Sequence, residues 1–200
     1  MRAQEESKNV DNSVSGKLNI KVIGVGGAGC NIVYSLQKDS EISRIVDFLI
    51  IDSDESHLSV LQNINERLFV EYPLDEDELS ADSVEKIKNY LKERLKRFNC
   101  VFLITSPGGR TGYTVGLQVA KIVRELKLPL LISILILPFE SEKRRKDVHQ
   151  KLTEFHRISD VALTVDNDLL LKIAPHLLLN EAFGKINDII AKLIKTFKNL

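Results

Sequence analysis

The stretch that decides the fold is IKVIGVGGAGCN, residues 20–31. Its first part is a short apolar run rich in β-branched residues, which is typical of a buried strand. The glycines that follow let the backbone approach a bound group, and a helix start beyond them offers free N–H groups with a favourable dipole. We therefore expect a strand that ends in a phosphate-binding loop, with a helix beginning after that loop.

Apolar runs of the same kind alternate with helical patterns along the rest of the chain. We expect strands at residues 18–24, 45–51, 100–105, 130–137 and 161–165, with a weaker candidate at 67–70. This alternation predicts a three-layer α/β domain with a mainly parallel, Rossmann-like sheet. We assign that domain to residues 17–200 and expect residues 1–16, which have almost no apolar content, to be a flexible tail.

Two helices are especially clear from the spacing of their apolar residues. One is predicted over residues 83–98, with Asp82 and Glu85 as a capping box at its start. The other is predicted over residues 181–197, with Phe183 among the apolar residues of its sheet-facing side. In parallel sheets ligands bind at the carboxyl ends of the strands, so candidate functional residues are sought in the loops there.

The composition of the chain limits the kinds of partner it is able to bind and the cellular compartment in which we expect it. Lys plus Arg and Asp plus Glu both total 28, so no global positive field attracts nucleic acid or an acidic membrane. The longest apolar run, residues 129–139, is too short to span a bilayer. Cys30 and Cys100 lack metal-ligand spacing and are expected to be small buried hydrophobes, while the four histidines are scattered. We expect a cytoplasmic protein with no nucleic-acid partner and at most indirect membrane contact.

A second glycine-rich loop, SPGGRTG at residues 106–112, follows the predicted strand 100–105 and opens another helix. Two such loops on one sheet are able to grip opposite sides of a phosphate chain. The first loop alone also satisfies the dinucleotide pattern GxGxxG, and Asp52 ends the next strand where a ribose-binding acid would lie. The second loop weighs against a nicotinamide-binding domain without excluding it.

Six segments, in order along the chain, resemble FtsZ of the tubulin/FtsZ superfamily. Residues 20–31 are similar to the opening phosphate loop, residues 52–58 to N-T-D-x-x-x-L, and residues 108–114 to the signature GGGTGTG. Further along, residues 138–142 are similar to P-F-x-x-E, residues 165–168 to P-N-D, and residues 181–183 to the start of the central helix. Together these ordered matches are far more specific than any single glycine motif.

The resemblance implies a guanine nucleotide, GTP or GDP, with magnesium as a candidate ion. It places the base against Phe183 by stacking and against Asn187 and Asn167 by hydrogen bonds, and the ribose near Glu142 and Lys146. The remaining residues that it assigns to the nucleotide are Gly26, Gly27, Gly29, Asn31, Gly108, Gly109, Arg110, Thr111 and Gly112.

Three departures from the family pattern bear on activity. Arg110 replaces the central glycine of the signature, so the loop has either lost a positive-φ position or gained a phosphate-binding guanidinium. Residues 71–78, EYPLDEDE, stand where the family has a glycine-rich loop that senses the third phosphate, and their carboxylates repel phosphate unless a metal intervenes. The sequence ends at Leu200, with the central helix, so the resemblance implies that the family's catalytic loop and second domain are missing. The catalytic residues stay unassigned, and we expect little or no hydrolysis.

Three functions remain open from the sequence. The first is a GTP-binding protein that associates with itself, or with a full-length FtsZ-like relative, in cell division, cell shape or membrane remodelling. The second is a scaffold of the same fold without nucleotide, which Arg110 and the acidic stretch favour. The third is a nicotinamide-dependent enzyme, which the ordered matches disfavour.

Overall fold

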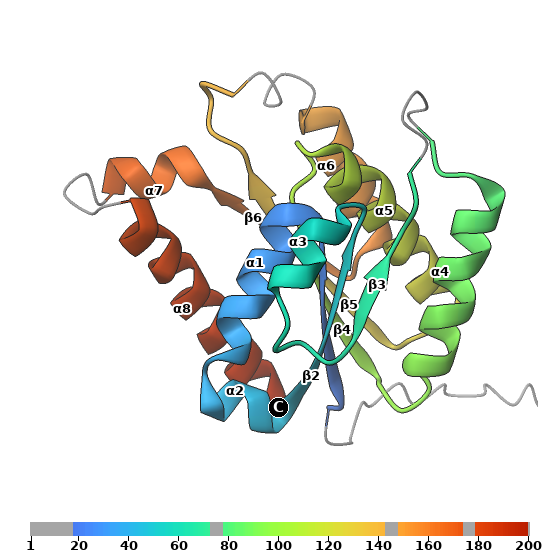
Figure 1. Ribbon diagram of the computed structural model, residues 1–200. Coiled ribbons are helices and arrows are strands. Elements are labelled where there is room, and N and C mark those ends of the chain that lie inside the picture. Colours follow the sequence, from blue (N-terminus) through green and yellow to red (C-terminus); the bar gives the residue numbers. More distant parts are fainter. Residues whose placement is uncertain (1–17, 73–77, 143–147, 174–178, 200) are drawn as a thin grey trace, which may run out of the picture.

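The computed structural model describes residues 18–72, 78–142, 148–173 and 179–199. The predicted tail at residues 1–16, most of the acidic stretch and Lys146 lie outside these ranges. The described chain folds into one six-stranded sheet in the order β3-β2-β1-β4-β5-β6, with every neighbouring pair parallel (Figure 1). The predicted α/β fold with a parallel sheet is therefore confirmed.

The strands lie close to their predicted positions because central strands such as β1 and β4 are buried on both faces and so read as nearly unbroken apolar runs. The weaker candidate is real but short, and it forms the edge strand β3. The bounds are β1 Ile20–Val25, β2 Val46–Asp52, β3 Arg67–Phe69, β4 Cys100–Thr105, β5 Leu130–Leu137 and β6 Val161–Asp166.

Helices cover both faces of the sheet and give it two separate apolar cores (Figure 1). One core joins the sheet to α4 (Ala81–Arg94), α5 (Arg110–Glu125) and α6 (Val148–Ile158). The other core joins it to the helices α1, α2, α3 and α8, which span Gly26–Gln37, Ser40–Ile45, Glu55–Val60 and Leu179–Lys198. The short helix α7 (Asn167–Ile173) follows β6 directly. In the described part of the chain, no helix combines the length and apolar character needed to cross a membrane.

The predicted starts of α1 and α4 lie too late along the chain. Helix α1 begins at Gly26, inside the glycine loop, because the positive φ of 70° at this glycine turns the chain straight from strand into helix. Helix α4 begins at Ala81, and its N-cap is Ser80, whose Oγ accepts from the Ser83 N–H at 3.1 Å. The expected capping box of Asp82 and Glu85 does not form because the helix has already begun.

The sheet-facing side of α8 also differs in one residue from the prediction. Ile186, Ile190 and Ile194 are buried in the core as their spacing requires, and Ala182 continues this row toward the start of the helix. Phe183 is instead 38% exposed and stands beside the row. Its ring is therefore available to something other than the core.

Candidate functional site

The loops after β1 and β4 diverge at one end of the sheet. β1 and β4 are neighbours, with Val25 opposite Thr105, but the chain leaves β1 for α1 on one face and leaves β4 for α5 on the other. In open α/β sheets such a switch point leaves a crevice at the carboxyl ends of the strands. A cavity of about 400 Å³ lies here, a size typical of sites for small ligands.

The cavity contains nine of the fourteen residues that the resemblance assigned to a nucleotide. These nine are Gly26, Gly27, Asn31, Gly109, Gly112, Glu142, Asn167, Phe183 and Asn187. The other lining residues are Val25, Ala28, Ile32, Ser106, Ile136, Pro138, Phe139 and Ile186. Ser106 belongs to the second glycine-rich loop and Phe139 to a segment that carries the resemblance, so the sequence held a signal for them, whereas Ile32 had none.

The two glycine loops touch each other at the base of the cavity. A Cβ atom on Gly26 would lie 2.9 Å from the backbone nitrogen of Gly112, so only glycine fits at this contact. The Thr105 hydroxyl lies 3.1 Å from the carbonyl oxygen of Val25 and 2.6 Å from that of Gly112. The buried end of β4 thus holds the loop after β1 against the loop that follows β4.

The glycines of the first loop have different roles. Gly27 is exposed to the cavity, and a Cβ atom on it would meet nothing within 4 Å. Gly29 is buried against β4, and a Cβ atom there would overlap the carbonyl oxygen of Ile104. Gly27 therefore keeps the cavity open, whereas Gly29 allows close packing of α1 on the sheet.

The helix starts at the cavity leave their first N–H groups without a side-chain cap. The N-caps of α1 and α5 are Val25 and Gly109, neither of which makes a side-chain hydrogen bond, and neither helix has an acidic residue in its first turn. By contrast, α2, α3 and α4 are capped by Asp39, Asp54 and Ser80. The donors that face the cavity are thus the ones left for a ligand.

The opposite side of the cavity is built by α8 and by the start of α7. The ring centroids of Phe183 and Phe139 lie 6.3 Å apart. The side-chain amide of Asn187 donates from Nδ2 to Ser35 Oγ at 2.9 Å, while its Oδ1 is buried without a partner. Oδ1 of Asn167 is also buried and unpaired among the described atoms. An unpaired buried acceptor costs about 1–3 kcal/mol until a donor reaches it.

Of the predicted residues that the structure describes, four do not line the cavity. Gly29 and Gly108 are buried, and the Thr111 hydroxyl lies 2.6 Å from Ser53 Oγ. The Arg110 guanidinium stacks over the Tyr72 ring at 4.0 Å from its centroid. The sequence left two roles for Arg110, and in this structure its guanidinium lies on an aromatic ring rather than on the cavity wall.

Asp52 is not a ribose-binding residue in this arrangement. It is 4% exposed, does not line the cavity, and its Oδ2 lies 2.8 Å from Nδ1 of His57. Cys30 lies against the same pair, so the structure groups three residues that the sequence analysis treated as separate. The nicotinamide interpretation loses the acid on which it depended.

A model of the GTPase domain of the tubulin/FtsZ family matches residues 19–175. The chain belongs to the tubulin/FtsZ family. The family that the sequence resembles is thereby confirmed.

Individual relatives agree with this family. Cell division protein FtsZ 2 of Methanocaldococcus jannaschii is 29% identical in an alignment of 189 residues, and the match covers 90% of this chain and 48% of that protein. An empty FtsZ dimer from M. jannaschii has a TM-score of 0.75 at 21% identity, covering 92% of this chain and 55% of its own. CetZ2 from Haloferax volcanii, solved as a protofilament with GTPγS bound, has a TM-score of 0.71 at 20% identity, with coverages of 90% and 58%. The chain spans about half the length of the curated relatives it matches.

Proposed function

We propose that this tubulin/FtsZ-family chain binds GTP or GDP in the cavity, as part of a cytoplasmic, self-associating protein of cell division, cell shape or membrane remodelling. The observation that carries the proposal is the pair of buried, unpaired amide oxygens on Asn167 and Asn187. The guanine edge carries donors at N1 and N2, whereas adenine presents an acceptor at N1. The two neighbouring donors of guanine suit the two asparagine oxygens, whereas adenine places its one donor group, N6, beside the acceptor N1 and would leave one oxygen facing an acceptor.

The rest of the nucleotide fits the remaining walls. Phe183 and Phe139 provide aromatic surface for the base, and Glu142 provides a carboxylate for the ribose. The phosphates would meet the uncapped starts of α1 and α5, near Gly27 and Gly109. A bound magnesium ion would add positive charge beside the phosphates, and backbone N–H groups would hold them in place.

The test is nucleotide content and selectivity. Protein purified from cells and then denatured should release guanine nucleotide, and GDP and GTP should bind the emptied protein more tightly than ATP does. Asn187→Ala should weaken guanine binding about 10-fold because it removes one acceptor. Asn89→Ala is the matched control, since Asn89 lies on the exposed side of α4 and its side-chain amide donates to Glu85. Equal binding of all three nucleotides, or none, would favour the nucleotide-free scaffold instead.

We further propose that these 200 residues alone hydrolyse GTP slowly or not at all. Hydrolysis needs a group that positions the attacking water, and such orientation contributes several orders of magnitude in rate. Among the described residues that line the cavity, Glu142 is the one ionisable side chain, and its Oε1 accepts from the Phe139 N–H at 3.0 Å. Phosphate release should therefore stay low until a full-length FtsZ-like relative is added. Multiple turnover that is unaffected by dilution would contradict this.

Self-association is proposed from the relatives, which include an FtsZ dimer and a CetZ2 protofilament. Sedimentation of the purified chain with GDP, with GTP and with an added full-length relative should reveal assemblies. A monomer under all three conditions would contradict this part of the proposal.

A further inference from the structure

Three potential metal ligands meet beside the nucleotide cavity. Cys30 comes from α1, Asp52 is the last residue of β2, and His57 lies in α3. Their ligand atoms, one sulfur, one oxygen and one ring nitrogen, all lie within 4.8 Å of one another. Cys30 and Asp52 are buried, whereas the His57 side chain is 20% exposed and gives a path from solvent.

Hydrogen bonds outside the group already orient all three of its members. The Cys30 thiol donates toward the carbonyl oxygens of Gly24, at 3.6 Å, and Ile51, at 3.4 Å. Asp52 Oδ1 accepts from the Ser53 N–H at 2.8 Å, and this leaves Oδ2 facing His57. On the far side of the imidazole, Nε2 lies 3.0 Å from Oδ1 of Asn31, an oxygen that only accepts. Nε2 is therefore the donor in this contact, while Nδ1 faces Asp52 Oδ2 within the group. A bond from the outer ring nitrogen to an oxygen is the usual support of a metal-binding histidine.

We propose that Cys30, Asp52 and His57 form a site for Zn²⁺ or a similar borderline-soft divalent cation. Zinc accepts a thiolate, an imidazole and a carboxylate together, whereas magnesium and calcium prefer oxygen ligands alone. The site is thus distinct from any magnesium ion held by nucleotide phosphates. A water molecule would complete the tetrahedron.

The distances within the group differ from those around a bound zinc ion by about 1 Å in each direction. Ligands of a tetrahedral zinc ion stand about 3.5 Å apart when the bonds are about 2.0–2.3 Å long. The gap of 2.8 Å between His57 Nδ1 and Asp52 Oδ2 must therefore widen by less than about 1 Å. Rotation of the partly exposed imidazole is able to supply this movement.

The cation would take the place of protons. Burial, with the nearby Asp52 carboxylate, raises the pKa of the Cys30 thiol, so the thiol keeps its hydrogen in the absence of a cation. On binding, the thiol proton and any proton on Nδ1 pass to water, and the sulfur and nitrogen lone pairs bond to the metal.

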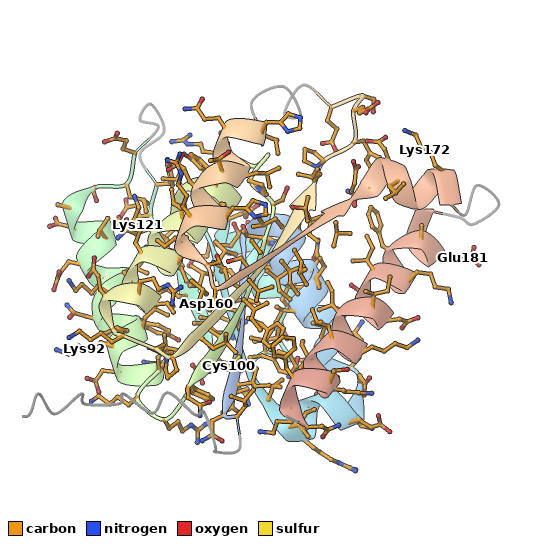
Figure 2. The ribbon with its side chains drawn as sticks, turned by 180° about the vertical axis from the view of Figure 1, so that it is seen from behind. Lys92, Cys100, Lys121, Asp160, Lys172 and Glu181 are labelled. Atoms are coloured by element: carbon orange, nitrogen blue, oxygen red, sulfur yellow. The ribbon has the colours of Figure 1, made fainter. Side chains whose placement is uncertain are left out.

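The test is Co²⁺ titration of nucleotide-free protein, since a thiolate bound to Co²⁺ gives a charge-transfer band in the near ultraviolet. The band should appear in the wild-type protein, disappear when Zn²⁺ is added and persist in excess Mg²⁺. It should be lost in Cys30→Ser, and His57→Gln should lower the affinity at least 10-fold. The matched control is Cys100→Ser, because Cys100 is also a buried thiol but begins β4, at the opposite end of the sheet (Figure 2).

Circular dichroism checks that each variant is folded. If Cys30→Ser does not fold, His57→Gln still tests the site, because it alters a side chain that is partly exposed. Absence of the band in the wild-type protein would overturn the proposal. So would a band that survives Cys30→Ser, disappears in Cys100→Ser or is removed by Mg²⁺.

Discussion

Gly29→Ala should destabilise the fold, whereas Gly27→Ala, two residues earlier in the same helix, should not. A Cβ atom on Gly29 would overlap the Ile104 carbonyl oxygen and lie 3.1 Å from the Ile104 carbonyl carbon and 3.3 Å from that of Gly24. All three are backbone atoms of the two central strands, so none is able to rotate away. Helix α1 must move off the sheet instead, and this loosens the packing of the buried Cys30 and Val33.

The magnitude follows from two opposing effects. Overpacking of a well-packed core costs about 1–3 kcal/mol, and a clash with backbone belongs at the upper end of that range. Alanine in place of glycine within a helix returns about 0.5–1 kcal/mol. We expect Gly29→Ala to lower the free energy of unfolding by about 2 kcal/mol. Gly27→Ala meets open space, so its stability should be unchanged or slightly higher.

Urea unfolding followed by circular dichroism measures both variants against the wild-type protein. Gly29→Ala should lower the midpoint without changing the slope, because the same surface is exposed on unfolding. Gly27→Ala should keep the midpoint but weaken nucleotide binding, since its methyl group enters the cavity. If the two variants unfold at the same urea concentration, the packing role assigned to Gly29 is wrong.

Three further changes test other contacts. Lys21→Ala should lower the free energy of unfolding, measured by urea unfolding, by about 3 kcal/mol, because Lys21 is fully buried and its ammonium group lies 2.7 Å from Glu66. The loss of unfolding free energy in Lys21→Met should be no larger. Burial raises the pKa of Asp160, but hydrogen bonds from Arg124 and a backbone N–H outweigh it and lower the pKa overall. The ionised Asp160 carboxylate therefore stabilises the folded protein above its unfolded-state pKa near 4, and this stabilisation is lost as pH falls through the folded-state pKa. The melting temperature of Asp160→Asn should accordingly fall less steeply below about pH 4 than that of the wild-type protein. Arg110→Gly should lower the free energy of unfolding by about 1 kcal/mol or less, because it removes the contact with the Tyr72 ring, and should leave nucleotide affinity unchanged. An altered affinity in a nucleotide titration would show that the guanidinium reaches the phosphates.

The sheet was predictable because its signal is local. The central strand β4 is buried on both faces, so a short window of sequence, residues 100–105, already shows a nearly unbroken apolar run. The placement of Gly26 and Gly109 at one end of the sheet follows in turn, since parallel strands all present their following loops at the same edge. Helix starts were less predictable. Ser80 and Asp82 are both good N-cap residues, and only the course of the chain before α4 selects between them.

The sequence by itself determined the fold class, the family and the two loops that border the cavity, because these depend on patterns within short segments. The tertiary structure alone separated Gly29 from Gly27, placed Arg110 on Tyr72 and brought His57 and Cys30 to Asp52. Those outcomes depend on contacts between elements that are distant along the chain. A local pattern shows which residues a segment offers, whereas the packing of helices on the sheet decides which of them meet.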